Sequence, residues 1–160
     1  MIVILDASAL INVLNAGVLS SFLQLPGVAF ATGPQVRAEC RQQREGIDAI
    51  IGCGLQALSD SDLPSSVFFS SLEEYGLGLG ETESLALAGH YGYNVCTDDR
   101  RARKMCASAL GPERVFGTAR LLRDSVLASV LTGEAALCAY EQMKAKGAFL
   151  PELPISYFEG

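Results

Sequence analysis

Acidic side chains in this sequence fall at the positions where a parallel sheet presents ligands. Asp6 comes directly after the apolar run 2–5, and Asp98 and Asp99 follow a strand predicted at 93–97. In open α/β sheets the binding crevice lies outside the carboxyl ends of the strands, so these carboxylates should face one crevice. Their positions, and not only their number, indicate a site.

Further acids come from predicted helices. Glu81 and Glu83 open a helix after the glycine-rich loop 76–80, and Glu39 lies inside a helix predicted over roughly 34–45. Acids in a first helical turn can simply complement the helix dipole, and a single acid on a helix is usually just solvated. Only the combination with the acids at the strand ends makes these residues candidates for a site.

The strand-end acids also have structural explanations. Asp6 could cap the helix that follows it, although Ser8 is a second candidate for that cap. The pair Asp98 and Asp99, followed by Arg100, could form a salt-bridged cap. We favour the site role because acids recur at matching strand ends.

Carboxylates that crowd one crevice point to a divalent cation. They repel each other, so some must take up protons or a cation must hold them together. Mg²⁺ and Mn²⁺ prefer oxygen ligands, and such a site suits phosphodiester hydrolysis through one or two ions. The single histidine, His90, excludes a multi-histidine metal site.

The elements that must position these acids alternate between apolar runs and helical patterns. We predict strands at 2–5, 28–31, 67–69, 93–97 and 115–116. We predict helices after residue 6 and at about 34–45, 47–58, 81–91, 100–110, 118–131 and 134–146, with a loop at 59–66 and an extended tail. This alternation indicates the α/β class, with a mostly parallel central sheet flanked by helices, in a single domain over 1–160.

Composition sets limits on the function. A chain of 160 residues that is 49% hydrophobic can bury a sizeable core, and no apolar run is long enough to predict a membrane span. Five scattered cysteines without a C-x-x-C pair predict reduced thiols in the cytoplasm. The net charge of −6 argues, at first reading, against nucleic acid as a partner. However, the six candidate acids account for the whole excess of 18 acids over 12 bases.

Five ordered segments resemble a PIN-domain nuclease, most closely the small prokaryotic PIN proteins that include VapC-type toxins. They are ILDASALINVL, PQVRAE, GLGLGETESLALA, VCTDDRRARKMC and VFGTARLL. The resemblance covers roughly residues 2–122 and extends less clearly into the C-terminal helices and extended tail at 118–160. It implies a three-layer PIN-like fold and cleavage of RNA with Mg²⁺ or Mn²⁺.

The resemblance also implies roles for single residues. Asp6 matches the metal-binding aspartate of the first strand, and Ser8 the hydroxyl residue that supports it. Glu39 matches the glutamate of the second motif. Glu81 matches the acid that opens the helix of the third motif, and Glu83 is a further metal ligand candidate.

The last motif departs from the family pattern. Asp99 matches the last-strand aspartate, and Asp98 beside it is a second candidate ligand, with Thr97 as a supporting residue. The further acid that the family often has three residues later is Ala102 here, which puts a second metal in doubt. The predicted catalytic residues are therefore Asp6, Glu39, Glu81 and Asp99.

The resemblance suggests partners as well. The basic residues Arg100, Arg101, Arg103 and Lys104 are predicted to contact the RNA backbone, although such a run is usually a solvated helix face. An antitoxin protein or a second copy of the chain could dock on the last forty residues, although ordinary packing against the sheet is the preferred explanation. The apolar residues in question are Leu121, Leu122, Val126, Leu127, Val130, Leu131 and Leu137. A catalytically silent PIN-like module that binds RNA or protein is the alternative function.

Overall fold

A five-stranded sheet forms the centre of the computed structural model, which describes residues 1–159. Its strands are β1 (Ile2–Leu5), β2 (Ala29–Thr32), β3 (Gln56–Ala57), β4 (Asn94–Cys96) and β5 (Val115–Phe116). They lie in the order β3-β2-β1-β4-β5, and each neighbouring pair is parallel. The predicted α/β class is confirmed, and the sheet is parallel throughout the described residues.

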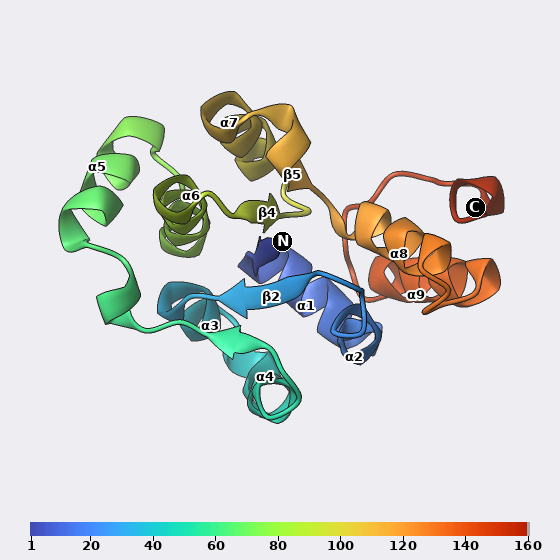
Figure 1. Cartoon of the computed structure of the whole chain (residues 1–160). Helices are drawn as coiled ribbons and strands as arrows, with labels where there is room; N and C mark the ends of the chain where they lie inside the picture. The colour runs from blue at the N-terminus through green and yellow to red at the C-terminus, as the bar shows by residue number, and fades with distance from the viewer. Residues whose placement is uncertain (160) are drawn as a thin grey trace.

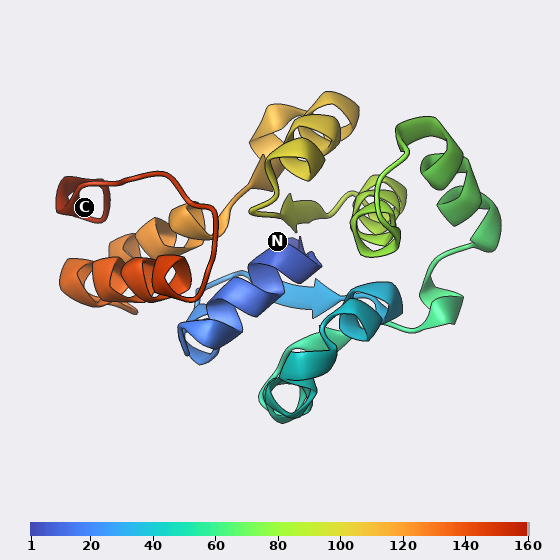
Figure 2. The same ribbon diagram turned by 180° about the vertical axis from the view of Figure 1, so that it is seen from behind.

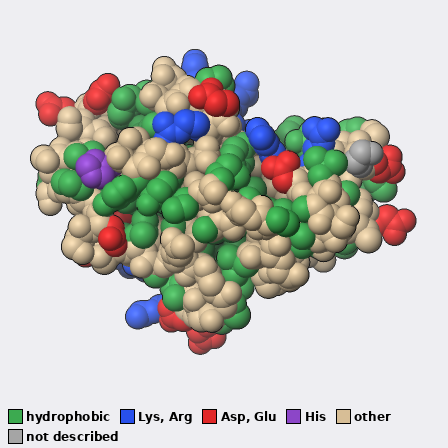
Figure 3. Space-filling model, viewed as in Figure 1, with side chains coloured by type: hydrophobic (Ala, Val, Ile, Leu, Met, Phe, Trp, Pro, Cys, Tyr) green, Lys and Arg blue, Asp and Glu red, His purple; other side chains and the backbone are tan. Residues whose placement is uncertain are grey.

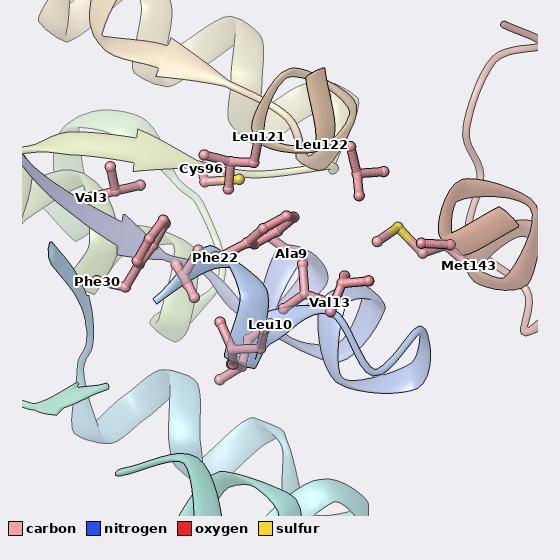
Figure 4. Packing of buried hydrophobic residues seen from close by; sticks show 14 of the residues in the cluster. Val3, Ala9, Leu10, Val13, Phe22, Phe30, Cys96, Leu121, Leu122 and Met143 are labelled. Carbon is pink, nitrogen blue, oxygen red and sulfur yellow. The ribbon is translucent and has the colours of Figure 1, made fainter. Parts of the chain in front are cut away.

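Strand β1 is central and buried on both faces, as a continuous apolar run predicts. Val3 and Leu5 point into the larger core cluster, whereas Ile4 points into a smaller cluster on the opposite face with Ala31 and Leu87. All three β1 side chains are fully buried. Figure 4 shows Val3 in the larger cluster with side chains from the sheet and the helices around it.

Helices cover both faces of the sheet, so the molecule has three layers (Figures 1 and 2). The helices are α1 (Ala7–Asn15), α2 (Leu19–Phe22), α3 (Pro34–Glu39), α4 (Arg44–Ile51), α5 (Ser65–Tyr75), α6 (Leu79–Tyr91), α7 (Arg100–Leu110), α8 (Thr118–Leu127) and α9 (Gly133–Ala145). The larger cluster packs α1, α2, α8 and α9 against one face, and α6 and α7 supply side chains to the clusters on the other. Helix α5 lies outside α6.

The third strand is not where the sequence pattern placed it. The apolar residues 67–69 lie in helix α5, where the rings of Phe68 and Phe69 pack edge to face. The strand is instead β3, which falls inside the helix predicted over 47–58. Both β3 residues are exposed on the sheet edge, so they show no apolar alternation that would mark a strand.

Several helix ends also differ from the predicted ones. Helix α3 ends at Glu39, and a 3₁₀ turn at Arg41–Gln43 separates it from α4. Helix α5 begins inside the segment predicted as loop, and α8 ends at Leu127, four residues early. The tail, predicted as extended, has no regular secondary structure up to residue 159 except for a 3₁₀ turn at Ile155–Tyr157.

The apolar side chains of the C-terminal region are used mainly within the chain. Leu121 and Leu122 are buried in the larger cluster, and Val126, Val130, Leu131 and Leu137 pack against it. Leu127, in contrast, is 58% exposed. Ordinary packing, the preferred explanation, therefore accounts for most of this set. None of the helices in residues 1–159 combines the length and hydropathy needed to cross a bilayer.

The strand order places a natural crevice next to β1. The chain passes from β1 outward to β2 and β3, then returns to β4 on the other side of β1 and continues to β5. In open parallel sheets, ligands bind outside the carboxyl ends of the strands at this point of reversal. Asp6 follows β1 and Asp98 and Asp99 follow β4, so the strand-end acids flank that point.

Candidate functional site

Asp6 is a buried carboxylate at the start of α1. Its Oδ1 accepts the Ala9 N–H and the Ser8 hydroxyl, each at 2.8 Å, so Asp6, rather than Ser8, caps the helix. The side chain is almost without water, because the residue is 2% exposed. Burial raises the pKa of Asp6 to about 6, although the hydrogen bonds oppose the rise. A nearby cation would favour the charged form of this carboxyl.

The Ser8 hydroxyl connects the ends of β1 and β4. Its oxygen accepts the backbone N–H groups of Asp98, at 2.9 Å, and Asp99, at 3.2 Å. It also lies 3.4 Å from the Thr97 hydroxyl, whose oxygen accepts the Asp99 N–H at 3.2 Å. Ser8 and Thr97, the two predicted supporting residues, thus lie between Asp6 and Asp99. They fix the backbone that follows β1 relative to the backbone that follows β4.

Asp98 is fully engaged by protein donors. It accepts bonds from the Asn12 amide at 2.8 Å, from the Thr118 N–H at 2.9 Å and from the Thr118 hydroxyl at 2.7 Å. The Arg103 guanidinium lies 3.5 Å away, and the Asp98 side chain is only 5% exposed. Both of its oxygens therefore join α1, α7 and α8 to the end of β4.

Asp99 is engaged less completely than its neighbour. Its Oδ1 caps α7 by accepting the Ala102 N–H at 2.7 Å. Among residues 1–159, no protein donor lies within hydrogen-bond distance of its Oδ2. Of the two adjacent aspartates, Asp99 is therefore the one with an oxygen available to a ligand.

Glu39 and Glu81 meet at the N-terminus of α6. Glu39 Oε1 accepts the Gly80 N–H at 2.8 Å, and Glu81 Oε2 accepts the Gly78 N–H at 3.0 Å. The first amides of a helix have no partner within the helix and carry its positive dipole end, so both carboxylates are stabilised there. A Cβ at Gly80 would lie 2.8 Å from Glu39 Oε2, so the carboxylate approaches this helix start closely.

Glu83 points to a different element. It is 4% exposed, and its carboxylate accepts the N–H groups of Gln35, at 3.0 and 3.1 Å, and Val36, at 3.1 Å. Burial raises its pKa, against the effect of these bonds. Glu83 from α6 thus caps α3, while Glu39 from α3 caps α6. Glu83 is committed to this pairing, so Glu81 is the more accessible acid of the two.

The acids also raise the pKa of two buried thiols. Burial raises the pKa of Cys40 to about 11, and the charges of Glu39 and Asp6 add to the rise. Burial raises the pKa of Cys106 to about 12, and the charges of Asp6 and Glu81 add to it. Asp6 therefore acts on one thiol together with Glu39 and on another together with Glu81.

The donor set fits a hard divalent cation in its chemistry. The candidate side chains offer only oxygen atoms, and Asp6 is buried with no cationic partner within 4.0 Å among residues 1–159. In the part of the chain that the structure describes, however, no three His, Cys, Asp or Glu side chains are gathered closely enough to hold an ion. Glu39 and Glu81 each bind one backbone amide through a single carboxylate oxygen, Glu39 Oε1 and Glu81 Oε2.

The basic residues of α7 differ in their availability. Arg100 and Lys104 are exposed to solvent. Arg101 is exposed as well, but donates to a backbone carbonyl in the loop before α6 at 2.9 Å. Arg103 donates two bonds to the Thr97 carbonyl, at 2.9 and 3.1 Å, besides its ion pair. Arg103 therefore holds the strand end in place, whereas the others can reach an external anion.

The sequence reasoning missed several residues beside the acids. Asn12 and Thr118 hold Asp98, and the segment 147–149 lines an open pocket of about 230 Å³ together with Ser8, Asp98 and Asp99. Phe149 stands at the pocket with its side chain fully exposed. Thr118 lies within the segment VFGTARLL, which offered a signal. Nothing in the local pattern around residue 149 shows that this tail returns to the site.

Comparison with known proteins assigns the chain to a family. A family model described as a PIN domain matches residues 2–156, which is nearly the whole chain. No curated protein and no solved structure matches the chain significantly.

Proposed function

We propose, from the premise that this chain belongs to the PIN-domain family, that it is a metal-dependent endoribonuclease that hydrolyses RNA phosphodiester bonds. PIN domains are generally nucleases, so the family implies a nucleic-acid substrate. The observation that carries the proposal is the meeting of Asp6 and Asp99 through the Ser8 hydroxyl, at the point where the strand order reverses.

The residues that would hold Mg²⁺ or Mn²⁺ are Asp6, Asp99 and Glu81, with Glu39 binding directly or through water. When bound, the ion would activate a water for in-line attack and offset charge on the phosphate. Glu83 and Asp98 were also predicted as ligands. Because both are bound to protein donors, we propose that they position the ligands instead.

The protein itself contributes orientation. The Ser8 hydroxyl and the Ala9 N–H fix Asp6 Oδ1, which leaves Oδ2 as the oxygen for a ligand. The Ala102 N–H fixes Asp99 in the same way. Carboxylates held in one rotamer need little reorganisation when a cation and a phosphate arrive, and such preorganisation is the main source of electrostatic catalysis.

The test is cleavage of end-labelled single-stranded and structured RNA with Mg²⁺ or Mn²⁺. We expect wild type to cleave within the chain, Asp6→Asn to lose at least about 100-fold in rate, and chelation to abolish cleavage. Asp124→Asn, the same change on the surface of α8, should cleave like wild type. Equal rates for wild type and Asp6→Asn would contradict the proposal.

The alternative function is a catalytically silent module that binds RNA or protein. Calorimetric titration with Mn²⁺ separates the two functions. Binding of Mn²⁺ to wild type that is lost in Asp6→Asn supports the nuclease, whereas RNA binding without any Mn²⁺ binding supports the silent module.

We also propose that the chain acts as the toxin of a toxin–antitoxin pair in the cytoplasm. The support is the resemblance to VapC-type proteins and two exposed apolar side chains beside the acids, Phe149 at the pocket and Leu79 in the first turn of α6, which is 50% exposed. An antitoxin segment that covers them would block the site. Co-purification with a short neighbouring gene product that inhibits RNA cleavage tests this role, and sedimentation tests for a homodimer.

A further inference from the structure

Three arginines outside the predicted basic helix line a groove of about 420 Å³ between α3 and α4. We call it the arginine groove; it is lined by Arg37, Arg41 and Arg44, together with Pro34, Ala38, Ile47 and Asp48. Within residues 1–159, no carboxylate oxygen lies within 4.0 Å of these three guanidinium groups. Three positive charges against the one acid, Asp48, give the groove a net positive charge in an acidic protein.

The groove is anchored to the same edge of the sheet as the acids. The Arg37 guanidinium donates to the Thr32 carbonyl at 2.7 Å and to the Leu58 carbonyl at 2.6 Å. Thr32 is the last residue of β2, and Leu58 directly follows β3. Because parallel strands end at one edge and neighbouring strands lie about 4.8 Å apart, the groove begins roughly one strand away from Asp6.

Charges along this edge therefore follow the order of the strands. The arginine groove lies at the carboxyl ends of β2 and β3, and the strand-end acids follow β1 and β4. The basic first turns of α7 begin directly after the acids that follow β4. Figure 3 shows Lys and Arg side chains near α4 at the lower edge and over α7 at the upper edge, with Asp and Glu side chains beside them at both places. The strand-end acids therefore lie between the arginine groove and the basic residues of α7.

The chemistry of the groove suits phosphate groups. Arginine presents a rigid planar fork that binds phosphate oxygens in pairs, and its charge persists at every working pH. Arg41 and Arg44 are exposed, and Arg41 uses its Nε on the Ala38 carbonyl at 3.2 Å, which leaves its terminal nitrogens for a ligand. Arg37 shapes the groove through its two carbonyl bonds.

We propose that the arginine groove binds the sugar–phosphate backbone of single-stranded RNA on one side of the scissile bond, while α7 binds it on the other side. This inference rests on the proposed nuclease function. An acidic protein segment would meet the same arginines, but the alignment of the groove with the strand-end acids favours a polymer that crosses all three regions.

The experiment measures binding of a fluorescently labelled single-stranded RNA over a salt series. It uses Asp6→Asn as the parent, with Mg²⁺ present, so that cleavage does not interfere. Arg41→Gln/Arg44→Gln in this background should bind about tenfold more weakly at low salt. The slope of log K against log salt should also fall by about 1.4, since each single-strand phosphate contact contributes about 0.7.

The matched control is Arg120→Gln/Arg123→Gln on α8. It removes the same charge, but these guanidinium groups pack over the rings of Phe116 and Tyr157. The control should keep the parental slope, and thermal melts should show that both double variants are folded. An unchanged slope of log K against log salt in Arg41→Gln/Arg44→Gln would overturn the proposal that the arginine groove binds RNA. So would binding of polyglutamate that depends on these arginines while binding of the RNA does not, because it would assign the groove to a protein partner.

This outcome is separable from that of the nuclease proposal. If wild type cleaves RNA but the salt slope does not change in Arg41→Gln/Arg44→Gln, the proposed role of the arginine groove is wrong and the proposed nuclease function stands. If wild type does not cleave under any divalent ion but the slope changes as expected, the groove stands as an RNA-binding surface and the nuclease falls.

Discussion

At the scale of single residues, Asp6 carries its charge where the fold leaves it almost no water. The raised pKa means that the folded protein holds this proton more tightly than the unfolded chain does. The protonated form contributes stability that is fully present below about pH 4 and is lost as the pH rises through about 6. At neutral pH without metal, ionised Asp6 therefore destabilises the fold.

Asp6→Asn should for this reason be more stable than wild type. The shift from 3.8 to about 6 corresponds to about 3 kcal/mol at pH 7, since one pKa unit is about 1.4 kcal/mol. Asparagine keeps the oxygen that accepts the Ala9 N–H. Denaturant unfolding with a chelator present should show the difference at pH 7, and the two proteins should converge at pH 4. A difference that is the same at both pH values would refute this account.

Substitution of the two adjacent aspartates, Asp98 and Asp99, should have different effects on stability and on Mn²⁺ affinity. Asp98→Asn places an amide donor against the donors of Asn12 and Thr118, so we expect a loss of about 2–3 kcal/mol in stability and little change in Mn²⁺ affinity. Asp99→Asn keeps its cap to Ala102 and should lose Mn²⁺ affinity at least about tenfold with little change in stability. Chemical denaturation and calorimetry measure the two effects, and the reverse pattern would make Asp98 the ligand.

At the scale of elements, α3 and α6 hold each other by their ends. Glu83 from α6 binds the first amides of α3, and Glu39 from α3 binds a first-turn amide of α6. Helix α3 has only six residues, so it cannot be stable alone and depends on this partner. These reciprocal hydrogen bonds between α3 and α6 set the position of Glu39 relative to Glu81.

Gly33→Ala should break this pairing. A Cβ at Gly33 would overlap the carboxylate of Glu83, while the φ of −86° and ψ of 167° suit alanine. We therefore expect a loss of about 2–3 kcal/mol from displacing the buried carboxylate, with no backbone strain. In Gly33→Ala/Glu83→Ala the two losses in stability should not add.

Gly46→Ala is the control, because its Cβ would lie at an ordinary 3.6 Å from the Leu14 side chain and Gly46 is inside a helix. It should stabilise the protein by about 0.5–1 kcal/mol. Additive losses measured by denaturant unfolding would rule the clash out.

Elements were predictable from sequence where burial imposes a pattern. The run at 2–5 and the helices at 81–91 and 100–110 could be placed because both-face burial, caps and glycine ends mark them. Strand β3 could not, because its residues face solvent and are held by pairing with β2 alone. The positions of the strand-end acids followed from topology, whereas the cross-helix bonds of Glu39 and Glu83 connect residues more than 40 positions apart and leave no local trace.

At the scale of the whole molecule, the tail belongs to the main core. Phe158 is fully buried beside Tyr140, whose hydroxyl donates to the Pro151 carbonyl at 2.8 Å. The segment 147–149, earlier in the same tail, lines the pocket beside Asp99. We therefore propose that residues 1–160 form one cooperative unit.

Two phenylalanines of the tail test this proposal. Phe158→Ala removes a fully buried ring and should reduce the free energy of unfolding by about 3–5 kcal/mol, in a single transition that still includes the sheet. Phe149→Ala removes a fully exposed ring and should change stability by less than about 0.5 kcal/mol. Far-ultraviolet circular dichroism and tyrosine fluorescence should report one midpoint for each protein. An early, separate loss of the tail would show that it is an independent segment.

The central position of β1 sets the order in which the molecule can assemble during synthesis. Ile4 pairs with Ala31 on one side but with Val95 on the other, so one edge of the first strand has no neighbour until β4 has been made. At about 5–20 residues per second, that wait lasts roughly 5–20 s on the ribosome. Asp6 leaves the exit tunnel early, yet the crevice that it shares with Asp99 can form only after more than half of the chain has been translated.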